Sequence, residues 1–387
     1  MNTRIVRDAV KKTIIRLSFI LPLKEDVILE SYPDFTDNAF AFYQYLLDVD
    51  FNKKHTIYWA LHERNKCPLQ LPENVKTFDL NAKGFRAMWQ RFLALYRSKF
   101  ILDGNSYIKK RRRGQIRIHL GHGMLIKITP DYHNPVELGE VDGFLTTADW
   151  WKNVFVDRVG LREEELLPIG YPRDDVIVRE KDIRADGKPY ILWLPTYRQH
   201  RNHLDDGMPH PFAYGMPEVS SGEELKQLDE RLGQIGYMLY FRPHPAQELS
   251  VFKKETLDHI IVADDRFLEE NHLELYEFLA RARALITDYS SVYYDFLLTD
   301  RPIGLTIGDR QEYFSKYGCA FANYTDGVIG EHIESFSDLL RFVERVADQT
   351  QMEQDLSAIK ERYHACTDGR SCERLYEYLR EKYHFGE

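Results

Sequence analysis

The sequence predicts an α/β protein built from two doubly wound parallel sheets. Short apolar runs typical of strands alternate with helical patterns along the chain, and this alternation is typical of parallel sheets with crossover helices. The alternation pauses at a Gly-Tyr-Pro-Arg turn, residues 170–173, and then resumes. A length of 387 residues exceeds one ordinary core and suits two domains.

Each half of the chain supplies its own strands and helices. In the first half, strands are expected at 26–30, 56–61, 76–78, 99–102, 116–120 and 143–146, with helices at 38–47 and 84–96. In the second half, strands are expected at 190–194, 237–241, 259–262, 284–287 and 302–305, with helices at 222–234, 272–281, 292–298 and 336–347. Two further helices, 352–364 and 370–383, close the chain.

These elements predict four segments: a helix at 1–22, a first domain at 23–168, a second at 169–350, and closing C-terminal helices at 351–387. Two Rossmann-like domains imply a central cleft between them. Ligands of such sheets bind beyond the carboxyl ends of the strands. Polar residues that directly follow a strand are therefore the first candidates for a site.

The N-terminal segment has a basic amphipathic pattern. Apolar side chains recur at three- and four-residue steps between residues 4 and 21. Five basic side chains occupy most of the remaining arc: Arg4, Arg7, Lys11, Lys12 and Arg16. This pattern is typical of a helix on an anionic membrane surface, although a helix docked on its own domain has the same pattern. No segment approaches the ~20 apolar residues that span a bilayer.

Composition excludes several classes of function. A net charge of −9 argues against wholesale nucleic-acid binding. The four cysteines show no C-x-x-C spacing, which favours a reducing compartment over a disulfide scaffold or a zinc site. Walker A and G-x-G-x-x-G motifs are absent. We therefore expect neither a metal nor a cofactor.

His122 is the first candidate catalytic residue. It follows the strand 116–120 and lies between Gly121 and Gly123, which let the backbone and the ring approach a substrate closely. A histidine of ordinary pKa is a suitable general base for a hydroxyl group. A loop histidine that serves packing is the alternative interpretation.

His244 is the second candidate. It follows the strand 237–241 between Pro243 and Pro245, which stiffen the loop. Together with Arg242 it suits a phosphate or diphosphate, although an ordinary turn histidine would also fit. The basic run 109–113 could bind anionic lipid or a polyphosphate chain. The alternative interpretation is a solvated loop.

A hydroxyl-rich turn follows the strand 284–287. Thr287, Asp288, Ser290 and Ser291 precede a helix expected from residue 292. Free N–H groups and the helix dipole would make this turn an anion site, and helix capping by a serine is compatible with that role.

Two arginines beside rigid turns are weaker candidates for diphosphate binding. Arg173 ends the turn 170–173, and Arg198 ends a Pro-Thr-Tyr-Arg segment, 195–198.

Together these motifs resemble the CDP-glycerol glycerophosphotransferase family, the primases and polymerases of teichoic acid synthesis and related capsule enzymes. The most specific match is the run ITDYSSVYYD at 286–295, continuing to Arg-Pro-Ile at 301–303. Further matches are 30–33, 37–38, 170–173, 195–198, 244–245 and 368–371, in the family's order. The family usually has a Trp-His-Gly-Thr box with a lysine shortly after it. In this sequence the corresponding residues are Gly121-His122-Gly123-Met124, and Lys127 stands in the place of the lysine.

The resemblance implies a GT-B-like fold whose C-terminal domain holds the donor, CDP-glycerol or another CDP-polyol. It implies a cytoplasmic enzyme on the inner face of the cell membrane, with a lipid-linked glycan or polymer precursor as acceptor. Gly123 and Lys127 would contact the acceptor or a phosphate.

The implied reaction is phosphoryl transfer. An acceptor hydroxyl would attack the β-phosphorus of CDP-glycerol, with His122 as base, and CMP would leave. The second-domain candidates would hold the diphosphate. The alternatives are a CDP-ribitol-specific transferase, a nucleotide-sugar glycosyltransferase of the same fold, and a non-catalytic membrane-bound module, for which the altered box around His122 is the support.

Overall fold

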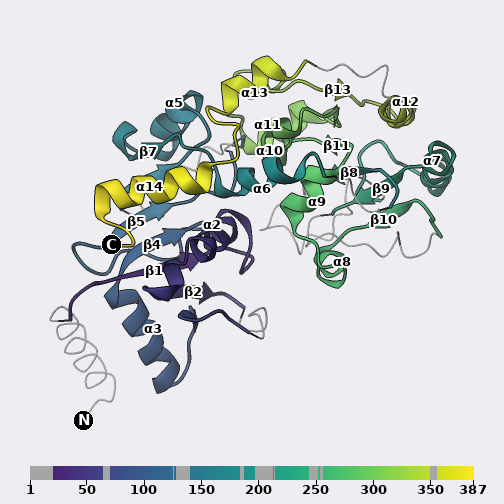
Figure 1. The fold of residues 1–387 in the computed structure, drawn as a ribbon. Coiled ribbons are helices and arrows are strands. Elements are labelled where there is room, and N and C mark those ends of the chain that lie inside the picture. Colours follow the sequence, from purple (N-terminus) through teal and green to yellow (C-terminus); the bar gives the residue numbers. More distant parts are fainter. Residues whose placement is uncertain are drawn as a thin grey trace, which may run out of the picture. The chain divides into compact units, whose positions relative to one another are not determined.

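A computed structural model of the chain describes residues 21–63, 70–124, 126–127, 140–183, 187–196, 212, 214–243, 252, 256–348 and 355–387. The chain forms two compact units (Figure 1). The first combines residues 1–122, 133–175 and 370–387, and the second combines 123–132 and 176–369. Each unit contains one parallel sheet with helices, so the predicted fold class is confirmed.

The first sheet has seven parallel strands in the order β3-β2-β1-β4-β5-β6-β7. Their bounds are β1 Lys24–Glu30, β2 Ile57–Leu61, β3 Val75–Asp79, β4 Ser98–Asp103, β5 Ile116–His119, β6 Gly143–Leu145 and β7 Leu166–Leu167. The central strands are almost wholly buried, as expected for a parallel sheet covered on both faces. Strand order reverses between β1 and β4, which makes this pair the topological switch point.

The helices of the first unit include a segment from the end of the chain. They are α2 (Asp37–Asp48), α3 (Phe85–Arg97), the single turn α5 (Lys152–Val154) and α14 (Ser371–Tyr383). Helix α14 packs on α2 through the ring contact of Tyr376 with Tyr45, and Phe385, just after the helix, contacts Phe100 of β4. Its N-terminus is held by Asp175, whose carboxylate accepts hydrogen bonds from the backbone N–H groups of Ser371 and Cys372, both at 2.7 Å.

The second sheet repeats the plan with six parallel strands in the order β10-β9-β8-β11-β12-β13. Their bounds are β8 Tyr190–Leu194, β9 Met238–Phe241, β10 Ile260–Val262, β11 Ala284–Thr287, β12 Ile303–Leu305 and β13 Glu331–His332. The switch point therefore lies between β8 and β11. The loops that follow these two strands carry the predicted Pro-Thr and 287–291 motifs.

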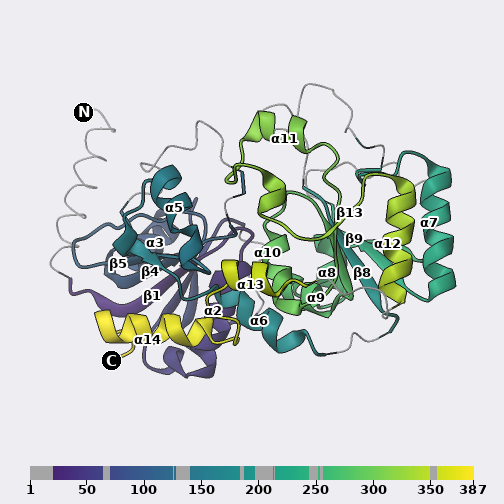
Figure 2. The same cartoon turned by 90° about the horizontal axis from the view of Figure 1, so that it is seen from above.

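Helices complete the second unit: α7 (Gly222–Ile235), α8 (Asp265–Glu270), α9 (Leu275–Arg281), α10 (Val292–Phe296), α11 (Arg310–Tyr317), α12 (Phe336–Ala347) and α13 (Ser357–Tyr363). Helices α7 and α12 lie side by side (Figures 1 and 2) and are joined by Arg231 and Glu344 at 2.7 Å. Both begin with a serine cap, Ser221 and Ser335, as helix N-termini favour. Helix α6 (Pro172–Glu180) begins in the first unit and ends in the second.

The structure corrects several expected elements. The helix predicted at 272–281 is the shorter α9, which begins at Leu275, and α8, which precedes it at Asp265–Glu270, was not predicted. His272, between the two helices, has a positive φ of 54° that interrupts the helical backbone. The helix predicted at 292–298 is α10 followed by a 3₁₀ turn, Leu297–Thr299. The two-residue strands β7 and β13 were not predicted, nor were helices α6 and α11.

The units also differ in extent from the four predicted segments. The first unit continues to Asp175, beyond residue 168, and it includes residues 370–387. The helix expected at 4–21 lies, apart from Leu21, outside the described residues. In the part of the chain that the structure describes, no helix is both long enough and apolar enough to cross a membrane.

Candidate functional site

Three neighbouring strands of the first sheet end in buried polar side chains. The parallel register sets Glu30 of β1 beside Asp103 of β4, and Asp103 beside His119 of β5. Glu30 and Asp103 are fully buried, and His119 nearly so. Because β1 and β4 flank the switch point, this edge is where a doubly wound sheet binds ligands.

A buried ion pair lies beneath this edge. Arg117 Nη2 lies 2.7 Å from Asp103 Oδ2, and neither side chain is exposed. Burial raises the pKa of Asp103 to about 7, although Arg117 acts to lower it. Burial, together with His122 and Arg117, holds the pKa of His119 well below its usual range. His119 is therefore neutral, and its Nδ1 accepts the backbone N–H of Gly121 at 2.9 Å.

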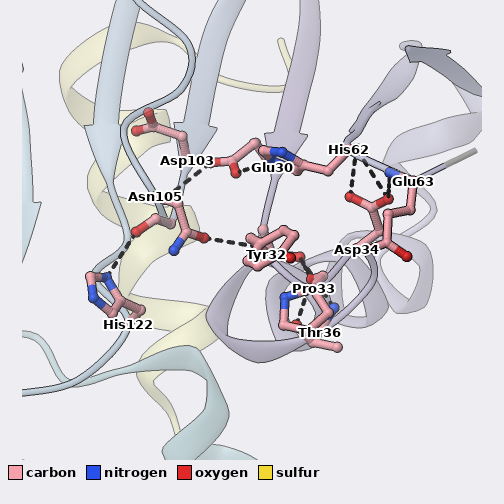
Figure 3. Close-up of polar contacts among 12 residues, drawn as sticks. Glu30, Tyr32, Pro33, Asp34, Thr36, His62, Glu63, Asp103, Asn105 and His122 are labelled. Carbon is pink, nitrogen blue, oxygen red and sulfur yellow. Dashed lines mark hydrogen bonds and ion pairs between the residues drawn. The ribbon is translucent and has the colours of Figure 1, made fainter. Parts of the chain in front are cut away.

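His122 is exposed, and its ring is fixed by a single backbone contact. Its Nδ1 lies 3.2 Å from the carbonyl oxygen of Gly104, in the loop after β4 (Figure 3). A carbonyl oxygen only accepts hydrogen bonds, so Nδ1 carries the proton of the neutral ring. Nε2 then has the lone pair. This is the tautomer in which an exposed imidazole can take a proton from a hydroxyl group.

The loop that carries His122 has a fixed path. Gly121 has a φ of +69°, and a Cβ at this position would lie 2.9 Å from the Tyr171 hydroxyl oxygen, so a side chain does not fit. Asn38 Nδ2 of helix α2 donates to the carbonyls of Leu120 and Gly121, at 2.9 and 3.0 Å. The predicted turn 170–173 and the predicted Asn38 thus brace the loop of the candidate base.

Arg173 belongs to this first unit and is almost wholly buried. Its Nη1 lies 2.6 Å from Asp37 Oδ1, and its guanidinium carbon lies 5.0 Å from the centre of the Tyr171 ring. Its backbone N–H donates to Asn38 Oδ1 at 3.2 Å. These contacts make Arg173 part of the framework of the first unit, whereas the other described donor candidates lie in the second.

In the second unit, Asp288 joins the two loops at the switch point. Its fully buried carboxylate accepts the backbone N–H of Thr196 at 2.8 Å and that of Tyr289 at 2.5 Å. Thr287 Oγ1 donates to the carbonyl of Leu194 at 2.8 Å. Both side chains hold the loop after β11 against the loop after β8. They therefore support the backbone of the predicted anion site.

Ser290 and Ser291 form the surface of that turn. Both are half-buried, and their backbone carbonyls accept the N–H groups of Tyr293 and Tyr294 at the start of α10. The Ser291 side chain does not cap the helix, so the capping alternative does not hold for this residue. Helix α10 has only 5 residues, so the serine hydroxyls are the main feature that suits an anion here.

The remaining predicted residues are less informative. Arg242 follows β9, and its guanidinium donates to the Ala263 carbonyl at 2.8 Å and to Asp265 Oδ1 at 2.6 Å, so much of its charge is balanced. Lys127 is exposed, and Gly123 has a φ of +144°. His244 and Arg198 lie outside the described residues.

Sequence reasoning missed one group of residues in the first unit. His62, directly after β2, has its Nε2 2.8 Å from Glu30 Oε1. The ring of Tyr107, in the loop after β4, lies 4.5 Å from the His62 ring. The sequence position of these residues could have indicated the contact, because Glu30 ends β1 and His62 directly follows the neighbouring parallel strand β2.

Two doubly wound parallel units with polar loops at their switch points define a GT-B-like α/β protein. The sequence profile of the CDP-glycerol:poly(glycerophosphate) glycerophosphotransferase family matches residues 13–381, and the chain belongs to this family. It is therefore a transferase, as predicted.

Curated relatives agree with this assignment, and a solved structure shares the fold. The chain is 22% identical to the teichoic acid glycerol-phosphate primase of Bacillus subtilis (strain 168), over 79% of this chain and 80% of the relative. It is 23% identical to the teichoic acid glycerol-phosphate transferase of Staphylococcus aureus (strain NCTC 8325 / PS 47), over 94% and 95%. A structure of the wall teichoic acid polymerase TagF superposes with a TM-score of 0.73 at 18% identity, covering 98% of this chain and 97% of that one.

Proposed function

We propose that the chain transfers a polyol phosphate from a CDP-polyol to a hydroxyl group of a lipid-linked glycan or polymer precursor and releases CMP. The family assignment supports the donor class. Relatives named as glycerol-phosphate and as ribitol-phosphate enzymes are both similar to the chain, so the proposal includes CDP-glycerol and CDP-ribitol. The ribitol-phosphate primase of Bacillus spizizenii (strain ATCC 23059 / NRRL B-14472 / W23) is 24% identical over 58% of this chain and 55% of the relative.

The proposed reaction is a direct displacement at phosphorus. The acceptor oxygen bonds to the β-phosphorus of the donor, the bond from that phosphorus to the bridging oxygen breaks, and CMP leaves with the bond electrons. The acceptor proton passes to His122 Nε2. Such a reaction depends on in-line positioning and on stabilisation of the developing charge more than on covalent catalysis.

The observation that carries the proposal is the orientation of His122. The Gly104 carbonyl fixes the Nδ1–H tautomer of an exposed ring at the carboxyl end of the sheet. We assign acceptor activation to this first unit. Donor binding is assigned to the second unit, at Ser290 and Ser291. Thr287 and Asp288 hold this turn in place. Further contacts to the diphosphate are assigned to Arg242, Arg198 and His244.

The reaction class is tested by its products. The protein is incubated with CDP-glycerol, CDP-ribitol and UDP-sugars, together with a lipid-linked acceptor, and the released nucleotide is identified. We expect CMP from at least one CDP-polyol and no UDP. Release of UDP with sugar transfer would instead assign a glycosyltransferase, and no turnover of any donor would favour a non-catalytic module.

Loss of both turn hydroxyls should weaken donor use. A hydrogen bond to a charged group contributes about 1.5–3 kcal/mol, so the Ser290→Ala, Ser291→Ala double variant, which removes two hydroxyls, should lower kcat/KM for the CDP-polyol by at least about tenfold. The measurement is CMP release against donor concentration. Ser337→Ala, an exposed serine of the same unit, is the control and should match wild type. Equal donor kinetics in the double variant would contradict the assignment.

We also propose that the enzyme is cytoplasmic and peripheral on the inner face of the cell membrane. Helix α3 supports this, because Phe85, Met88 and Trp89 are exposed by 82%, 50% and 41%. The helix carries three arginines and no acidic residue. Arg112, from the basic run 109–113, donates to the carbonyls of Leu21 and Tyr96. These contacts connect that run to the end of α3 and to the segment that follows residues 4–20.

Membrane binding should depend on both segments. Sedimentation with anionic liposomes should fall about tenfold or more when residues 1–21 are removed, because each basic residue contributes about 1 kcal/mol to binding. A similar fall is expected for the Phe85→Ser, Trp89→Ser double variant, because each aromatic ring buried in the membrane contributes about 1.5–3 kcal/mol. Binding should also fall with salt. Val49→Ser, at another exposed apolar position of the first unit, should bind like wild type. Binding that ignores anionic lipid and both changes would contradict the proposal.

A further inference from the structure

We propose that the loops after β1, β2 and β4 form a subsite for a neutral sugar unit of the acceptor. The subsite consists of Tyr32, His62 and Tyr107, held by Glu30 and Asn105. This inference rests on the proposed function, because it assigns the group that lies next to the reacting hydroxyl.

The subsite presents two exposed aromatic rings, each in contact with the same sheltered imidazole. The rings of Tyr32 and Tyr107 lie 5.2 and 4.5 Å from that of His62, at interplanar angles of 70° and 74°. Tyr32 is 46% exposed and Tyr107 58%, whereas the His62 side chain is only 12% exposed. Large rings that remain exposed offer a face for an apolar ligand surface and a hydroxyl for a polar one.

Buried carboxylates hold these loops in place. Glu30, fully buried, accepts from His62 Nε2 at 2.8 Å and from the backbone N–H of Asn105 at 3.1 Å. Asp34 accepts the backbone N–H groups of His62 and Glu63, at 2.9 and 2.8 Å. The rings are therefore positioned before a ligand arrives, which reduces the entropic cost of binding.

The same loop positions the subsite and the candidate base. Gly104 holds Nδ1 of His122, and the next residue, Asn105, accepts the backbone N–H of Tyr32 through Oδ1 at 2.8 Å. Figure 3 shows this series of contacts from His122 through Asn105 to Tyr32. A ligand bound at Tyr32 and Tyr107 would therefore lie at the same edge of the sheet as His122, the candidate base for the acceptor hydroxyl.

The charges favour a neutral, hydroxyl-rich ligand over a phosphodiester. Where His62 Nε2 donates to the Glu30 carboxyl oxygen, Nδ1 of the neutral ring can accept from a hydroxyl. Glu30 and Asp34 lie within the framework and would repel a phosphate. Of the described cations at this edge, Arg117 is paired with Asp103 and Arg173 with Asp37. A sugar ring, with an apolar C–H face and polar edges, matches this composition.

The test compares two acceptors that differ in their terminal group. One is a short-chain lipid-diphosphate analogue that ends in a disaccharide, and the other is the same analogue already extended with one polyol phosphate. Tyr107→Ala should raise KM for the sugar-terminated acceptor about tenfold and raise that for the phosphate-terminated acceptor less. Tyr107→Phe should restore most of the loss, because it keeps the ring. Trp150→Ala, another exposed aromatic of the first unit, is the matched control.

Direct binding separates this inference from the proposed reaction. Saturation-transfer NMR with an octyl pyranoside measures the subsite without any donor, and Tyr107→Ala and His62→Gln should each lose the signal. Loss of that signal supports the subsite even if no CDP-polyol is turned over, an outcome that would defeat only the proposed function. Unchanged sugar binding and an unchanged KM in Tyr107→Ala, or a larger effect on the phosphate-terminated acceptor, would overturn the inference.

Discussion

Replacing His122 with asparagine or alanine is expected to lower the rate of transfer by about 10²–10⁴-fold, the usual contribution of one general base. Because the side chain is exposed and is held only through Nδ1 to the Gly104 carbonyl, its removal leaves no cavity and little unsatisfied polarity. The melting temperature should therefore stay close to that of wild type. The measurement is kcat for CMP release, with thermal unfolding measured on the same samples.

The control for this prediction is His384→Ala, an exposed histidine of the same unit, 72% exposed as a side chain. It should keep both wild-type turnover and wild-type stability. The corresponding prediction for the second unit is that His244→Ala also abolishes transfer, which rests on the sequence motif alone. Wild-type turnover in the pure His122→Asn variant would show that His122 is not the general base and would favour the alternative interpretation, a loop histidine that serves packing.

Replacing Arg117 with methionine is expected to lower the free energy of unfolding of the first unit by about 3–5 kcal/mol at pH 8, because it leaves the Asp103 carboxylate buried without its partner. The loss should be smaller at pH 6. The folded pKa of Asp103 is about 7, well above the ~3.9 of an unfolded aspartate, so at pH 6 the group is largely protonated and needs less compensation. The same shift makes wild-type stability fall as pH rises from about 4 to about 7.

Tryptophan fluorescence during urea unfolding measures this effect, because all tryptophans except Trp193 lie in the first unit. Arg162→Met is the matched control, since its pair with Glu165 is largely exposed on the arginine side and exposed ion pairs contribute little to stability. The double variant Arg117→Met, Asp103→Leu should recover part of the lost stability. An Arg117→Met protein as stable as the control at pH 8, or one destabilised more at pH 6, would contradict this account.

The fold could be predicted from sequence where the signal is local. Apolar runs such as 27–29 and 100–102 are buried on both faces and stand out from their polar neighbours. Strand β7 has two residues and depends on pairing with β6, so it leaves no pattern of its own. The return of α14 to the first unit depends on contacts between residues almost two hundred positions apart, such as Asp175 with Ser371, and no periodicity encodes these.

The candidate site shows the same division. His122 and its flanking glycines form a short motif, and the sequence identified them. The tautomer of His122 depends on Gly104, 18 residues away, and the contact between His62 and Glu30 spans 32. Arg173 was assigned to the donor because its charge is visible in the sequence, whereas its buried partner Asp37, 136 residues away, is not.

The return of α14 to the first unit has a consequence for synthesis of the chain. Most of the second unit, residues 176–369, is an insertion between Asp175 and Arg370 of the first. A ribosome that adds about 5–20 residues per second needs roughly 10–40 s to make that insertion. During this time the nascent first sheet lacks the helix that packs on α2, and Phe100 lacks Phe385. The last residue of the second unit is therefore synthesised before the last residues of the first, although the first unit begins earlier in the chain.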